Sequence, residues 1–155
     1  MSNFFPFVAP ILWSFVAPSA ECYVIHDGYP PPVLGGITLL WLANLGFWWS
    51  HASLGDNWFP DVRTRDEQTL SDQGCYAHVR HPMYTALWIW AIGNALIWHG
   101  MAVAIQAFFW LDVAVIAVLF NLRAAQEEEM LVGKLGEEYR QYMGRVRCRF
   151  VPYVL

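Results

Sequence analysis

Residues 101–122 read MAVAIQAFFWLDVAVIAVLFNL, and Asp112 is the single charged residue among them. A helix that crosses a bilayer needs about 20 predominantly apolar residues, so this stretch predicts a transmembrane helix. The whole chain agrees, because 57% of its residues are hydrophobic and only 14% are charged. Soluble domains carry about 25% charged residues. The composition therefore predicts an integral membrane protein and excludes an intrinsically disordered chain.

Three further apolar stretches precede this one. Residues 83–98 and 33–49 predict two more spans, and residues 4–20 predict a fourth, although Pro10 would kink it. A signal peptide is the alternative for residues 4–20, but no basic residue precedes them, so we expect a retained span. The sequence predicts one all-α domain over residues 1–155, an integral membrane bundle of about four transmembrane helices with short cytosolic helices at the C-terminus.

The basic residues lie on one side of this pattern. No Lys or Arg precedes Arg63, and all nine fall in residues 50–82 or 123–155. Because cytoplasmic segments carry the excess of Lys and Arg, both polar segments are expected to face the cytosol. The chain has no basic patch outside these segments, so no nucleic-acid partner is expected. The oligomeric state is left open, and a monomer is compatible with the sequence.

The polar loop ends in GCYAHVRHPMY, residues 74–84. His81 precedes a proline and should be non-helical, whereas Pro82 suits the first residue of a helix. The unpaired N–H groups at such a helix start favour an anion. Alternatively, Arg80 only reaches lipid phosphate and His81 only caps the helix. His78 and His81 lack the further ligands that zinc needs, so no metal site is expected.

The helix that begins near residue 101 should continue into the cytosol. Arg123 and Glu127 are four residues apart and therefore share a helix face. They are either an ordinary exposed pair or a cation and an anion that line a cavity. Gly136 is expected to end this helix. A short helix should follow, with Tyr139 and Tyr142 on one face, where membrane-interface anchoring is the alternative to a role in the site.

These motifs resemble a known family. Residues 74–76 and 80–84 resemble the signature of isoprenylcysteine carboxyl methyltransferases and their bacterial and archaeal relatives, and phospholipid N-methyltransferases share a looser version. The resemblance covers residues 54–152. Three positions depart from the family pattern: Gln68 stands where many members have His, Cys75 where Pro or Val is common, and Leu135 where Phe is usual. The second half of the signature is matched by Arg123, Glu127, Glu128, Leu131, Gly136, Tyr139, Tyr142, Arg149 and Pro152.

The resemblance implies an S-adenosyl-L-methionine site built from residues 50–82 and 123–155. It assigns the substrate carboxylate to Arg123, as the catalytic and substrate-binding residue. The implied cofactor-binding residues are Gln68, Thr69, Leu70, Ser71, Tyr76, His81, Pro82, Met83, Tyr84, Glu127 and Glu128.

The expected protein is thus an integral membrane S-adenosylmethionine-dependent methyltransferase. It would be an integral membrane protein, of the inner or plasma membrane if the source is a prokaryote, with its active site facing the cytosol. Its partners would be membrane lipid and a lipophilic or prenylated substrate from the bilayer, with carboxyl O-methylation of a prenylcysteine-like carboxylate as the leading reaction. The alternatives are N-methylation of phosphatidylethanolamine, or a non-catalytic membrane interaction protein of the same fold. A soluble Rossmann-type methyltransferase is not supported, because no G-x-G-x-x-G is present.

Overall fold

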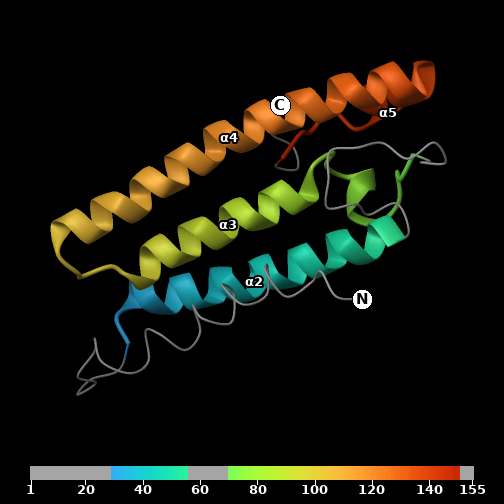
Figure 1. Cartoon of the computed structure of the whole chain (residues 1–155). Coiled ribbons are helices and arrows are strands. Elements are labelled where there is room, and N and C mark those ends of the chain that lie inside the picture. The colour runs from blue at the N-terminus through green and yellow to red at the C-terminus, as the bar shows by residue number, and fades with distance from the viewer. Residues whose placement is uncertain (1–28, 56–69, 151–155) are drawn as a thin grey trace, which may run out of the picture.

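The computed structural model describes residues 29–55 and 70–150. Within these two ranges every regular element is helical, as the sequence predicts. In chain order the elements are α2 (Pro31–Leu54), the 3-10 turn η3 (Gly74–Ala77), α3 (Pro82–Ile97), α4 (Val103–Leu135) and α5 (Glu137–Arg145). The three long helices lie side by side with α3 in the middle, while η3 and α5 lie together at one end (Figure 1).

Two of the helices, α2 and α4, are long and apolar enough to cross a membrane. The middle helix α3 has 16 residues and is therefore about 24 Å long, shorter than a hydrocarbon core of about 30 Å. The predicted span over residues 4–20 lies outside the described residues. The described part of the chain thus contains two candidate spans.

Proline and glycine set the helix boundaries. Pro31 and Pro82 occupy the first turns of α2 and α3, where a missing N–H costs nothing. Helix α4 continues well past the apolar stretch and ends at Gly136, whose φ of 60° favours glycine. The amide of Gly136 closes the last turn by donating to the Val132 carbonyl at 3.0 Å. The predicted continuation of this helix and its predicted end are both confirmed.

Helices α2 and α3 pack closely through small residues. A Cβ added to Gly36 would lie 2.6 Å from the Gly93 carbonyl oxygen, so the two backbones nearly touch. Leu40 lies against Gly93, and Ala43 on α2 and Ala86 on α3 are buried farther along the same interface. Small residues at a helix interface allow this approach in membrane proteins. Large apolar side chains on the outer faces are exposed, as expected of lipid-facing helices: Trp41, Leu45, Trp48, Phe108, Leu111 and Leu119.

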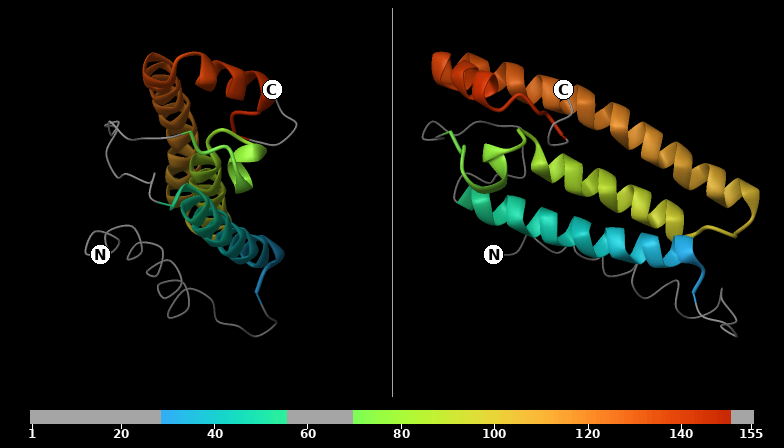
Figure 2. Two further views of the ribbon diagram at one scale, coloured as in Figure 1. Left: turned by 90° about the vertical axis from the view of Figure 1, so that its right-hand side faces the viewer. Right: turned by 180° about the vertical axis from the view of Figure 1, so that it is seen from behind.

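The chain doubles back after α4. Helix α5 places Tyr139, Tyr142 and Val146 in a buried cluster with Leu70 and Leu131. Residues after α5 then run along the start of α3, where the amides of Arg80 and His81 donate to the carbonyls of Cys148 at 3.0 Å and Arg149 at 2.9 Å. Figure 2 shows this return of the chain between α4 and α3. It brings residues 146–150, the C-terminal segment, onto the N-terminal end of α3.

Candidate active site at the start of α3

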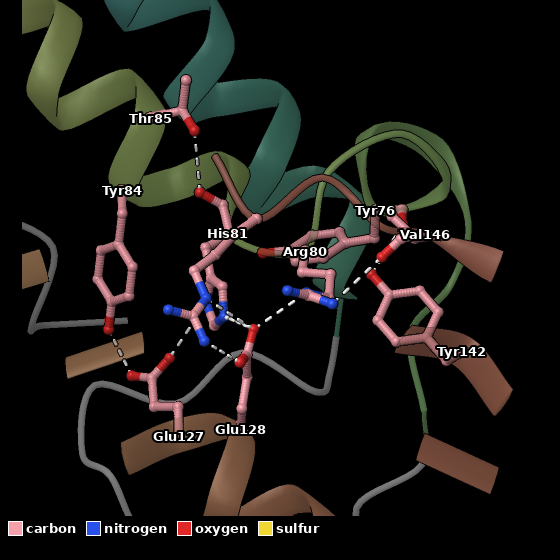
Figure 3. A network of polar contacts seen from close by, with 10 residues as sticks. Tyr76, Arg80, His81, Tyr84, Thr85, Glu127, Glu128, Tyr142 and Val146 are labelled. Carbon is pink, nitrogen blue, oxygen red and sulfur yellow. Dashed lines mark hydrogen bonds and ion pairs between the residues drawn. The ribbon is translucent and has the colours of Figure 1, made fainter. Parts of the chain in front are cut away.

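His81 lies where the polar loop meets α3, and its side chain points towards α4 (Figure 3). Its backbone is non-helical, as the following proline requires. The side chain makes no capping hydrogen bond to α3, so the capping alternative is wrong. Instead Nε2 lies 3.1 Å from Glu128 Oε1 and Nδ1 lies 3.6 Å from Glu127 Oε2. His81 therefore connects α3 to two successive carboxylates of α4.

Burial by itself would lower the pKa of His81, because it disfavours the charged ring. The hydrogen bonds and charges of Glu127 and Glu128 act in the opposite direction and prevail, so the pKa lies above its ordinary value. The imidazolium is thereby stabilised between the two glutamates.

Glu128 is the centre of a buried ion cluster. Only 7% of the residue is exposed, and Arg80 Nε lies 3.0 Å from its Oε1. Arg149 binds it through two nitrogens, Nε to Oε1 at 3.2 Å and Nη2 to Oε2 at 2.5 Å. Such a forked contact between guanidinium and carboxylate is strong and geometrically specific. Oε1 of Glu128 is thus occupied by Arg80, His81 and Arg149, and Oε2 by Arg149.

The neighbouring Glu127 is more accessible, with 26% of its side chain exposed. Its Oε1 accepts the hydroxyl of Tyr84 and lies 3.6 Å from Arg123 Nε. Arg123 itself is 47% exposed at the side chain. The predicted pairing of Arg123 and Glu127 on one helix face is confirmed. A carboxylate has about four acceptor positions, so Glu127 retains capacity for a ligand donor.

Side chains hold α5 and the following residues against this cluster. The hydroxyl of Tyr142 donates to the Tyr76 carbonyl at 2.8 Å, and Thr85 Oγ1 donates to the Phe150 carbonyl at 2.5 Å. Tyr139 and Tyr142 are each only 2% exposed, so they are buried packing residues and not interface anchors. Burial raises the pKa of Tyr142, which keeps its hydroxyl protonated as a donor.

A cavity of about 410 Å³ opens beside the cluster, between α3, α4 and the C-terminal segment. Volumes of this order are typical of small-molecule sites. One part of the lining is polar and the other is aromatic or apolar. The lining residues are Arg80, Tyr84, Thr85, Trp88, Ala117, Phe120, Asn121, Arg147, Arg149 and Phe150.

Tyr84 connects this cavity to Glu127. Tyr84 lines the cavity, stacks on Phe120 with ring centroids 4.9 Å apart, and donates its hydroxyl to Glu127. Arg123 and Glu127 do not line the cavity. Glu127 and Arg123 thus lie at the hydroxyl end of Tyr84, next to the cavity but outside its lining.

The structure brings some of the predicted site residues together and separates others. His81, Tyr84, Arg123, Glu127 and Glu128 converge, with Pro82 and Met83 at the helix start beside them. Tyr76 is held at the edge of the site, because its carbonyl accepts the hydroxyl of Tyr142.

Two predicted cofactor residues have other contacts. Leu70 packs in the apolar cluster of α5, and Ser71 donates to the Ser53 carbonyl of α2 at 3.1 Å. Gln68 and Thr69 lie outside the described residues.

Sequence reasoning assigned no role to Arg147 and Trp88, and it left Arg80 open between an anion site at the helix start and a lipid-phosphate contact. Arg149 was noted only as part of a signature. Its partner Glu128 is 21 residues away. The spacing of residues along the chain does not predict a contact between two residues so far apart.

The fold and the site define a helical membrane protein with an ion cluster and a cavity where its apolar helices end. The model of the isoprenylcysteine carboxyl methyltransferase family matches residues 36–133, which is more than half of the chain. The chain belongs to that family.

Two relatives are each named protein-S-isoprenylcysteine O-methyltransferase. The one from Schizosaccharomyces pombe is 36% identical over 84 residues, which are 54% of this chain and 33% of the relative. The one from Dictyostelium discoideum is 28% identical over 78 residues, which are 50% of this chain and 31% of the relative. The match thus spans about a third of the length of each relative.

Proposed function

We propose that this protein is a membrane-embedded S-adenosylmethionine-dependent methyltransferase that esterifies the carboxylate of a lipophilic, prenylcysteine-like acceptor. The observation that carries the proposal is the cavity at the end of the apolar helices, which joins arginines and aromatic side chains and adjoins Glu127 through Tyr84. Family membership and the names of the two relatives support the reaction class.

The residues around Glu127 fit the proposed methyl donor. S-adenosylmethionine supplies, when bound, an electrophilic methyl group on a sulfonium, and it also carries an ammonium and a carboxylate. Glu127 is an accessible carboxylate that can accept from the ammonium, and the N-terminal end of α3 at Pro82 can hold the carboxylate of the donor. Tyr76 and Met83 are half-buried nearby and offer apolar surface. Glu128 is assigned a structural role and not a contact with the donor, because Arg80, Arg149 and His81 already surround it.

The charges favour an anionic acceptor. Three arginines line the cavity, and among its described lining residues none is acidic. An anionic acceptor is stabilised by such surroundings, whereas methylation of an amine would call for a carboxylate in the lining. Carboxyl methylation is therefore preferred to amine methylation.

Methylation of an ionised carboxylate does not require a general acid or base from the protein. An ionised carboxylate is already a nucleophile, so the residues must orient it and exclude water. Arg123 is proposed to orient the acceptor oxygen, since a planar guanidinium matches a planar carboxylate. The C-terminal segment, held by Glu128 and Thr85, covers the start of α3 and limits access of water.

The proposed topology keeps the four spans and the single domain over residues 1–155. Residues 50–82 and 123–155 would face the cytosol, because they contain every Lys and Arg of the chain. The active site would then open to the cytosol at the level of the membrane interface.

The function is tested by supplying labelled S-adenosylmethionine with an S-prenylcysteine derivative and, in parallel, with phosphatidylethanolamine. We expect label in a base-labile ester of the first and none in the second. Base-stable label in the phospholipid would select the amine reaction instead. An absence of transfer to either acceptor by protein that binds the cofactor would contradict both.

The role of Arg123 is tested by Arg123→Lys in the same assay. Lys keeps the charge but loses the planar fork, so turnover should fall at least tenfold while the protein stays folded. Arg140→Lys on α5 is the matched control, because Arg140 is exposed and its ion-pair partner among the described residues is Glu137. Turnover by Arg123→Lys within about twofold of wild type, a barrier change of about 0.4 kcal/mol, would remove Arg123 from the mechanism.

A further inference from the structure

One of the three arginines that line the cavity is not neutralised. Arg80 and Arg149 both pair with Glu128. Arg147, two residues before Arg149, is exposed and pairs with no carboxylate in residues 29–55 or 70–150. Its charge is therefore available to a ligand in the cavity.

The rest of the cavity suits a hydrocarbon chain. Trp88, Ala117, Phe120 and Phe150 supply apolar surface. The indole nitrogen of Trp88 donates to the Val113 carbonyl at 3.3 Å, so its polar atom has a partner. Apolar walls with a few placed polar groups are the usual composition of a small-molecule site. An amphiphile with one anionic group and one apolar chain matches both parts.

We propose that Arg147 binds the carboxylate of the acceptor in this cavity and thereby selects anionic over neutral lipids, while the apolar chain lies against Trp88 and Phe120. The identification of this ligand as the methyl acceptor rests on the proposed function. Arg123 lies with Glu127 at the hydroxyl end of Tyr84, outside the cavity lining. Arg147 holds the carboxylate from the cavity side and determines acceptor affinity, while Arg123 orients the reacting oxygen of the same carboxylate next to the Tyr84 hydroxyl.

Equilibrium binding tests this assignment without turnover. Purified full-length protein in neutral detergent is titrated with an N-acylated S-prenylcysteine, with its carboxamide, and with a lysophosphatidic acid of similar chain length. Wild type should bind the carboxylate at least tenfold more tightly than the carboxamide, and more tightly than the phosphate. Arg147→Gln should reduce the preference for carboxylate over carboxamide to within about twofold.

The carboxamide serves as the folding control, because its affinity for Arg147→Gln should equal that for wild type. Arg140→Gln, remote on α5, should keep the full preference for the carboxylate. A preference that survives in Arg147→Gln would overturn the proposal, as would tenfold tighter binding of the phosphate lipid by wild type.

Activity separates this proposal from the proposed function. In methyl transfer, Arg147→Gln should raise the acceptor KM about tenfold and leave kcat nearly unchanged. If carboxylate binding depends on Arg147 but wild type forms no methyl ester, the binding site stands and the proposed reaction fails. If wild type forms the ester and Arg147→Gln keeps the wild-type KM, the reaction stands and the assignment of Arg147 fails.

Discussion

Helix α3 has two neighbours and contacts them in different ways. Against α2 it packs through glycine and small side chains, with the Gly36 and Gly93 backbones nearly touching. Against α4 it packs through Trp88, Phe109 and Val113 at mid-helix, and through the ion cluster at its N-terminal end, with the cavity between them. The first contact leaves no room for a ligand and the second does. Binding and chemistry are therefore assigned to the α3–α4 side, and α2 serves as its support.

The largest expected loss of stability comes from breaking the ion cluster between α3 and α4. Glu128→Gln leaves the guanidiniums of Arg80 and Arg149 without their carboxylate, which should cost about 3 kcal/mol for charged, mostly buried partners. Hydrogen exchange should accelerate at the amides of Arg80 and His81, which bond the C-terminal segment. Exchange in α2 should stay unchanged.

Glu129→Gln is the control, because Glu129 follows Glu128 directly on α4 but is exposed. Equal exchange at Arg80 and His81 in Glu128→Gln and wild type would show that the cluster does not hold the C-terminal segment.

The next effect concerns the α2 side. Gly36→Ala would place a methyl group 2.6 Å from the Gly93 carbonyl, so overpacking should cost about 2 kcal/mol in the free energy of unfolding. Gly35→Ala is the matched control, since nothing lies within 4 Å of its added Cβ. Denaturation in mixed micelles measures both. Equal stabilities of the two variants would contradict the close packing of α2 on α3.

A smaller effect should follow from removing one hydroxyl. Tyr142→Phe keeps the buried ring but loses its hydrogen bond to the Tyr76 carbonyl. The free energy of unfolding should fall by about 1 kcal/mol. The acceptor affinity of this variant should be unchanged, because Tyr142 does not line the cavity. A loss of acceptor binding as large as that of Arg147→Gln would place Tyr142 in the site.

The smallest expected effect is a dependence of the free energy of unfolding on pH. The pKa of His81 is raised in the folded protein, so protonation of the ring stabilises the fold below its ordinary pKa of about 6.5. This contribution is lost as the pH rises through the raised value. The free energy of unfolding, measured between pH 5.5 and 8.5, should therefore decline with pH. His81→Gln should flatten that decline, and an equal slope in both proteins would exclude His81 as its source.

Sequence chemistry predicts the local parts of this arrangement well. Pro82 starts α3, Gly136 ends α4, and Arg123 meets Glu127 one turn away, because each of these features depends on neighbours within a few residues. The same reasoning predicts the all-helical class from the long apolar stretches.

The long-range parts could not be predicted in the same way. Glu128 and Arg149 are 21 residues apart, and Gly36 meets Gly93 across two helices. Nothing in the spacing of these residues indicates that they meet, because their contact depends on how the helices pack and how the chain turns back after α5. The cavity around Arg147 arises from the same return of the chain, which is why its lining was missed.

The central claim is that Glu127, on the accessible side of Tyr84, binds the methyl donor. Calorimetric titration of S-adenosylmethionine into wild type, Glu127→Gln and the control Glu129→Gln tests it most directly. Loss of a charge-assisted hydrogen bond costs about 1.5–3 kcal/mol, so Glu127→Gln should bind about 10- to 150-fold more weakly. Glu129→Gln should bind like wild type. Equal affinity of all three proteins, or no binding by folded wild type, would contradict the account.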